Sequence, residues 1–141
     1  MYGKQLKKFL NFLEEEGFKI HFGIDSSLYY EDSLIVCNSR LSDEKTLYTL
    51  LHEYGHVVLR NNEKYCKIYR SQFKEKIDGR HGRSNSFKID VLREEFDAWR
   101  IGLEMAESLD IPIDLEKYDK YSSKYLKSYC HWVCDSNQWS L

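Results

Sequence analysis

The order of hydrophobic and polar residues predicts one helix and three short strands in the first part of the chain. Residues 4–16 place apolar side chains at helical spacing, and Gly17 follows where such a helix would end. Apolar and polar residues then alternate over 18–22, which is the period of a strand. Two more apolar runs, 28–30 and 34–37, stand on either side of a short polar turn and indicate a hairpin. We therefore expect a small three-stranded sheet, antiparallel or mixed.

Three longer helical patterns follow the predicted sheet. The first, over 42–60, begins with Ser42 as a candidate N-cap and continues with acidic residues that suit the positive end of a helix. The other two, over 86–108 and 115–132, are separated by a short break that contains the only proline of the chain. This order of elements predicts an α+β fold in a single domain over 1–141.

The segment between the first two of these helices is set apart by its charge. Residues 61–85 are polar and basic, and they predict a long loop or insertion with at most a helical turn or two near 65–73. From Lys64 to Lys88 there are eight Lys or Arg against two acidic residues, although the whole chain has a net charge of −2. The chain as a whole is therefore not a polycation for nucleic acid or membranes. The basic segment has two interpretations, a rim that binds nucleic acid or acidic protein targets, or a loop that is only solvated.

The cysteines and the N-terminus bear on the expected compartment. None of the four cysteines forms the closely spaced pairs of a zinc finger. No apolar run near the N-terminus is long enough for a signal peptide or a membrane span, so we expect reduced thiols, a cytoplasmic protein and no membrane partner. Cys130 and Cys134 lie one helical turn apart, and we expect both to be buried thiols.

One short motif carries candidate chemistry. The predicted helix over 42–60 contains the segment HEYGH, in which His52, Glu53 and His56 match the pattern HExxH. Side chains four residues apart lie one above the other on a helix, so the two imidazoles can bind one zinc ion. Glu53 lies beside them, where it can take a proton from the zinc-bound water. On a helical wheel these polar residues fall opposite the apolar side, as expected for a ligand face.

A catalytic zinc site usually has three protein ligands, and the next predicted helix supplies candidates for the third. Its apolar arc includes Phe96 and Trp99, and Glu95 falls in the middle of that arc. A carboxylate that faces a core is unfavourable unless it is paired or bound to a metal, so we choose Glu95 as the third ligand. Glu94, at the edge of the arc, is the alternative ligand, whereas Asp97 falls on the solvent side. A salt bridge from Glu95 to a buried cation would also explain its position.

The chain resembles the ImmA/IrrE-type metallopeptidases, which include small stand-alone members from phages and bacteria. The resemblance covers roughly residues 33–109 and rests on LIVCNSRLSDEKTLYTLLHEYGHVVL and on EEFDAWRIGLEMA in the next helix. These peptidases are similar to the gluzincins, whose third zinc ligand is a Glu on the helix after HExxH, and their E-x-x-A pattern matches Glu95 to Ala98. The resemblance implies a zincin-like minimal domain with Glu95 on the metal. At Trp99, many relatives carry Asp or Asn as a partner for a ligand histidine.

These observations predict a zinc-dependent metallo-endopeptidase with one Zn²⁺ per chain. His52, His56 and Glu95 would bind the metal, and Glu53 would act as the general base in peptide hydrolysis. The resemblance implies a specific protein substrate, such as a repressor or another regulator, and the host cytoplasm as the location of a phage-encoded member.

Two alternative functions remain open. A SprT-like protease acting on DNA-associated proteins would use the basic segment for DNA, but such enzymes supply a third histidine, and the helix over 86–108 has none. A metal-stabilised module that binds nucleic acid or a partner protein would keep its function after Glu53→Gln, whereas both peptidase hypotheses predict inactivation. The group that stabilises the oxyanion is also open, and the candidates are His81, His131 and the tyrosines of the last predicted helix.

Overall fold

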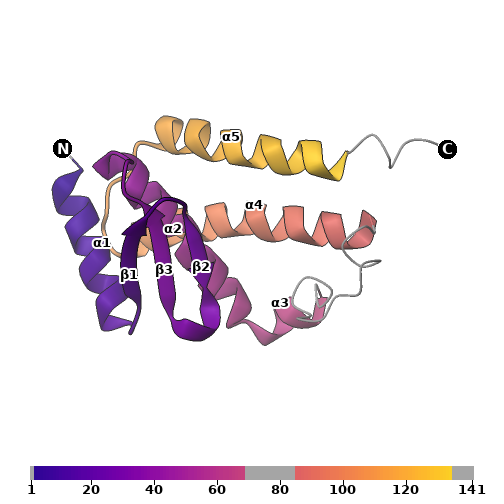
Figure 1. Cartoon of the computed structure of the whole chain (residues 1–141), viewed down its shortest axis with the longest axis horizontal. Helices are drawn as coiled ribbons and strands as arrows, with labels where there is room; N and C mark the ends of the chain where they lie inside the picture. Colours follow the sequence, from indigo (N-terminus) through magenta and orange to yellow (C-terminus); the bar gives the residue numbers. More distant parts are fainter. Residues whose placement is uncertain (1, 69–84, 135–141) are drawn as a thin grey trace.

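The computed structural model describes residues 2–68 and 85–134, and it has the predicted α+β arrangement (Figure 1). The four longer helices begin and end within one residue of their predicted bounds. In chain order the elements are α1 (Gly3–Glu15), β1 (Lys19–Gly23), β2 (Ser27–Tyr29), a 3-10 turn η1 (Tyr30–Asp32), β3 (Leu34–Asn38), α2 (Asp43–Arg60), α3 (Glu63–Ile68), α4 (Asn85–Ser108) and α5 (Leu115–Val133).

The three-stranded sheet is mixed, and its strands lie in the order β1-β3-β2. The middle strand, β3, is parallel to β1 and antiparallel to β2. The chain reverses between β2 and β3 through η1 and Ser33, whose φ of 48° lies in the left-handed region that tight turns use. β2 is therefore an edge strand, and its outer side has no strand partner within residues 2–68 and 85–134.

Helix α2 is the central element of the described structure. Ser42 caps it, because its hydroxyl oxygen accepts a hydrogen bond from the backbone N–H of Lys45 at 3.3 Å. The helix contacts α1, β3, α4 and α5, so it is covered on several sides. Its polar residues are consequently buried along with its leucines: Thr49, Glu53 and His56 are each less than a tenth exposed. The helical wheel had placed these residues on an outer face, away from the core.

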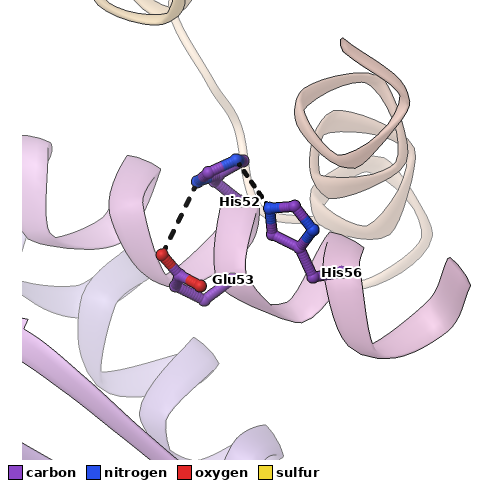
Figure 2. Close-up of side chains that lie close together, drawn as sticks. All are labelled: His52, Glu53 and His56. Carbon is purple, nitrogen blue, oxygen red and sulfur yellow. Dashed lines mark hydrogen bonds and ion pairs between the residues drawn. The ribbon is translucent and has the colours of Figure 1, made fainter. Parts of the chain in front are cut away.

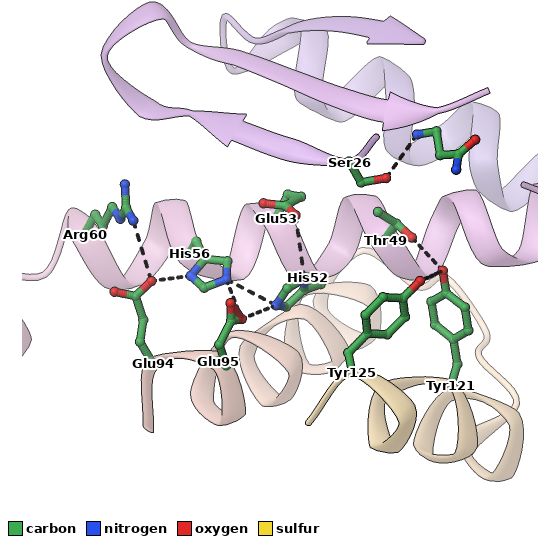
Figure 3. A network of polar contacts seen from close by, with 11 residues as sticks. Ser26, Thr49, His52, Glu53, His56, Arg60, Glu94, Glu95, Tyr121 and Tyr125 are labelled. Atoms are coloured by element: carbon green, nitrogen blue, oxygen red, sulfur yellow. Dashed lines mark hydrogen bonds and ion pairs between the residues drawn. The ribbon is translucent and has the colours of Figure 1, made fainter. Parts of the chain in front are cut away.

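Glycines bring the backbones of α2 and α4 into direct contact. A Cβ at Gly55 would lie 2.1 Å from the carbonyl oxygen of Ala98, and a Cβ at Gly102 would lie 2.6 Å from the carbonyl oxygen of Leu51. Each helix thus has a glycine where the backbone of the other passes. This close approach sets the HExxH face of α2 against the first half of α4 (Figure 3).

Two expectations about side-chain burial are wrong. Cys130 and Cys134 are exposed free thiols. Cys130 follows the buried Tyr121 by nine residues, which is about 180° around a helix, so it points away from the core. Phe96 is 59% exposed. It follows Glu95 by one residue and therefore points about 100° away from the buried face of α4.

The predicted loop over 61–85 is also revised in part. Its first residues form the short helix α3, which the sequence analysis had allowed only as a helical turn further along. Residues 69–84 lie outside the described residues. They include His81 and most of the basic segment, with its candidate contacts to nucleic acid. None of the described helices is long and apolar enough to cross a lipid bilayer.

Candidate metal centre

The two histidines of the HExxH motif face each other on α2, one helical turn apart. Their ring centroids are 4.7 Å apart, and the two Nε2 atoms are 3.1 Å apart (Figure 2). Because residues four apart lie one above the other on a helix, this pairing follows directly from the spacing in the sequence. The two Nε2 atoms point to a common position above the surface of α2.

Glu95 of α4 completes a group of three atoms at this position (Figure 3). Its Oε2 lies 2.8 Å from Nε2 of His52 and 3.0 Å from Nε2 of His56. A tetrahedral zinc ion with ligand distances of about 2.0–2.1 Å separates its ligand atoms by about 3.3 Å. The three atoms therefore fit a zinc ion after moving apart by a few tenths of an ångström, and two imidazole nitrogens with one carboxylate oxygen form a normal donor set for catalytic zinc.

Glu53 is the other carboxylate close to the histidines. Ligand atoms of His52, Glu53 and His56 all lie within 4.8 Å of one another, so these three residues alone could also hold a metal ion. However, the histidine nitrogen nearest to the Glu53 carboxylate is Nδ1 of His52 at 3.7 Å, on the ring edge away from the shared position (Figure 2). The geometry therefore favours Glu95 as the third ligand and leaves Glu53 beside the site.

Glu94 orients His56 from the opposite side of the ring. Its Oε2 accepts a hydrogen bond from Nδ1 of His56 and lies 3.8 Å from Nη2 of Arg60. The side chain is completely buried, and Oε1 has no hydrogen-bond partner among the described residues. With Nδ1 donating to Glu94, Nε2 is the ring nitrogen that faces the candidate metal position, where a bound zinc ion would take the place of its proton. From the sequence, Glu94 was predicted only as the alternative ligand, and its hydrogen bond with His56 was not foreseen.

His52 is held in a different way. The indole of Trp99 stacks on its imidazole, with ring centroids 4.1 Å apart and planes inclined by 9°. Trp99 is 4% exposed, and its carbonyl oxygen accepts a hydrogen bond of 2.6 Å from the hydroxyl of Tyr118. A rigid aromatic face therefore fixes the imidazole of His52.

The charges in the site are strongly coupled. Burial raises the pKa of the Glu53 carboxyl, an effect that His52 and His56 partly offset. Burial would also raise the pKa of Glu95, but its hydrogen bonds with the two histidines lower that pKa far below its ordinary value. Burial would lower the pKa of His56, but its hydrogen bonds to Glu94 and Glu95 raise it to about 10. Glu53 is thus the more basic carboxylate, as a proton acceptor should be.

These residues line a cleft with a volume of about 350 Å³. One wall is the edge strand β2, which contributes Ser27 and Leu28, and another is α5, which contributes Tyr125 and Tyr129. Burial and the nearby Glu95 carboxylate raise the pKa of Tyr129. Its hydroxyl therefore stays protonated and can donate a hydrogen bond inside the cleft.

The structure thus brings together all four predicted site residues, His52, Glu53, His56 and Glu95. Of the candidates for the oxyanion-stabilising group, Tyr125 and Tyr129 of α5 line the cleft, whereas His131 is exposed and does not line it. Among the other tyrosines of α5, Tyr118 and Tyr121 are buried in the core.

We compared the chain with models of protein families, with curated proteins and with solved structures, and none of the three comparisons produced a match. The ImmA/IrrE-type resemblance therefore stays a prediction. The geometry of the candidate metal centre is the basis for inferring a function.

Proposed function

We propose that this protein is a zinc-dependent metallo-endopeptidase of the ImmA/IrrE type. The observation that carries the proposal is the convergence of Nε2 of His52, Nε2 of His56 and Oε2 of Glu95 within 3.1 Å of one another. The fourth element is Glu53, a buried carboxylate directly beside this group. Two histidines, a glutamate ligand and a neighbouring carboxylate base are the parts that metal-assisted peptide hydrolysis needs.

Each residue has a distinct task in this proposal. Bound zinc would supply the Lewis acidity that polarises a peptide carbonyl and makes water easier to deprotonate. Glu53 takes the proton of the attacking water and passes it to the leaving amine. Because Glu53 is 8% exposed, bulk solvent has little access to the proton that it carries.

Tyr129 is the group that we assign to the developing oxyanion. It lines the cleft on the wall that α5 forms, and Glu95 is the carboxylate with the largest influence on its pKa. A neutral hydroxyl that donates to the tetrahedral oxyanion stabilises the transition state more than the ground state. His81 is not needed for this task.

The shape of the cleft supports a peptide as the substrate. The edge strand β2 forms one wall, and the outer side of an edge strand can pair with an extended chain through backbone hydrogen bonds. A repressor or another regulatory protein is the target that the ImmA/IrrE-type resemblance suggests. No described feature favours a SprT-like site, since α4 offers no histidine.

The decisive experiment separates hydrolysis from metal binding. The chain is loaded with one equivalent of zinc and incubated with a peptide mixture derived from a bacterial proteome, and new peptide termini are identified by mass spectrometry. We expect cleavage by the wild type and none by Glu53→Gln, with equal zinc content in both. Zinc binding without cleavage by the wild type, or equal cleavage by both, would contradict the proposal and favour the metal-stabilised binding module.

A further inference from the structure

A second hollow, with a volume of about 260 Å³, lies between the first turns of α2 and the N-terminal half of α5. We call it the lysine groove, because four of the seven residues that line it are lysines. The lysines are Lys45 of α2 and Lys117, Lys120 and Lys124 of α5. Tyr48 and Tyr121, both buried, form its floor.

The charge of the lysine groove is not balanced within the described structure. None of the four ammonium groups lies within 4.0 Å of a carboxylate of residues 2–68 or 85–134. The one acidic residue in the groove, Glu44, already accepts a hydrogen bond of 2.8 Å from the hydroxyl of Tyr48. Lys120 and Lys124 are also one helical turn apart, a like-charge spacing that disfavours the helix unless an anion lies between them.

The lysine groove adjoins the metal cleft. The hydroxyl of Tyr121, in the groove, is 3.0 Å from Oγ1 of Thr49 and 3.1 Å from the hydroxyl of Tyr125, and the last two residues line the cleft (Figure 3). Along α2, Lys45 precedes His52 by seven residues on the same helical face. That spacing corresponds to about 10 Å along the helix axis, which an extended peptide covers in about three residues.

We propose that the lysine groove binds acidic side chains of the protein substrate, about three or four residues to one side of the bond that is cut. This inference rests on the proposed peptidase function, because it assigns the groove to the same bound chain. Charge-assisted hydrogen bonds from lysines to carboxylates would select the substrate, and the tyrosine floor would contact the carbon atoms of the acidic side chains.

An acidic peptide fits this groove better than a nucleic acid does. The lysines can bind either kind of anion, so the length of the groove decides between them. The groove is only as long as the two helical turns from Lys117 to Lys124. A few carboxylates can use such a short cationic site, whereas nucleic-acid binding depends on many phosphate contacts in succession.

The first arm of the test measures binding without turnover. Zinc-loaded Glu53→Gln protein is titrated with a fluorescein-labelled hexaglutamate peptide, and fluorescence anisotropy gives the affinity. Adding Lys120→Glu and Lys124→Glu should weaken binding roughly tenfold or more. The matched control adds Lys7→Glu and Lys8→Glu on α1, which changes the net charge equally and should leave the affinity within about twofold.

Two results of this arm would overturn the inference. One is equal weakening by both pairs of substitutions, which would mean that hexaglutamate responds only to net charge. The other is displacement of the peptide by oligothymidylate at lower concentration than by unlabelled hexaglutamate, which would assign the groove to nucleic acid. All four lysines are exposed, so the variants are expected to fold, and thermal unfolding followed by circular dichroism checks this.

The second arm uses the wild-type protein and the proteome-derived peptide mixture. Cleaved peptides should be enriched in Asp or Glu about three or four residues to one side of the cut, and the Lys120→Glu, Lys124→Glu variant should lose that enrichment. Cleavage without an acidic preference overturns the lysine-groove inference and leaves the proposed function standing. Zinc binding without any cleavage overturns the proposed function, and the binding arm then decides whether the groove still binds acidic peptide.

Discussion

Gly55 of α2 faces the backbone of Ala98 in α4 so closely that a Cβ at position 55 would lie 2.1 Å from the Ala98 carbonyl oxygen. Gly55 directly precedes His56, and Ala98 lies one helical turn after Glu94. The contact that packs the two helices is therefore also the contact that sets the distance between the histidines and the acidic residues of α4. The interface between α2 and α4 thus both holds the two helices together and positions the candidate metal ligands.

Substituting Gly55 by Ala tests that relationship. A methyl group cannot fit against a backbone oxygen at this distance, so the helices must separate, and we expect a loss of about 3 kcal/mol in the free energy of unfolding together with weaker zinc binding. Urea denaturation of the metal-free protein measures the first effect. Gly3→Ala is the control, because its Cβ would meet its nearest neighbour, an Asp43 carboxylate oxygen, at an ordinary 3.7 Å. Equal stability of the two variants would contradict the account.

The stacking of Trp99 on His52 predicts an effect on metal affinity. Trp99→Leu removes the aromatic face that fixes the imidazole, and we expect zinc to bind roughly tenfold more weakly. Trp99→Phe keeps an aromatic ring and should lose less. Competition with a chromophoric chelator, at a temperature where both variants are folded, gives the two dissociation constants. An unchanged affinity in Trp99→Leu would show that α2 alone orients His52.

Tyr129 is predicted to act on the rate and not on the metal. Removing one oxyanion donor lowers kcat by about 10²–10³-fold, so Tyr129→Phe should lose that much activity while keeping its zinc. Tyr125→Phe is the matched control on the same wall of the cleft, and its effect should be much smaller. The comparison requires kcat and zinc content for each variant on a peptide that the wild type cleaves. A larger loss in Tyr125→Phe than in Tyr129→Phe would reverse the assignment.

The sequence predicted the four longer helices, the three strands and the grouping of His52, Glu53, His56 and Glu95 in one place. Helix bounds follow from caps and periodicity, and Ser42 caps α2 as predicted. The spacing of HExxH brings His52 and His56 together, and a carboxylate in the apolar arc of α4 pointed to Glu95. All of these depend on the repeat of a single helix, which can be read without knowing what packs against it.

The parts that could not be predicted depend on how the helices pack against one another. A wheel gives the direction of a side chain but not its neighbour, so it could not show that Glu94 bonds to His56 or that Trp99 stacks on His52. The same limit applies to α5, where Tyr121 packs in the core and Tyr125, one turn later, lines the cleft. The predicted burial of Phe96 was wrong for a related reason: the part of α4 that is buried is narrower than the apolar arc of its helical wheel.

The central claim is that α2 and α4 together form a zinc site with Glu95 as its third ligand. Its most direct test is the metal content, measured by mass spectrometry, of wild type, Glu95→Ala and Glu94→Ala proteins purified identically and offered micromolar zinc. We predict about one zinc per chain in the wild type. Glu95→Ala should lose the metal, and Glu94→Ala should still bind it, about 10–100-fold more weakly. A wild type that stays empty, or a Glu95→Ala protein that keeps its zinc, would contradict the account.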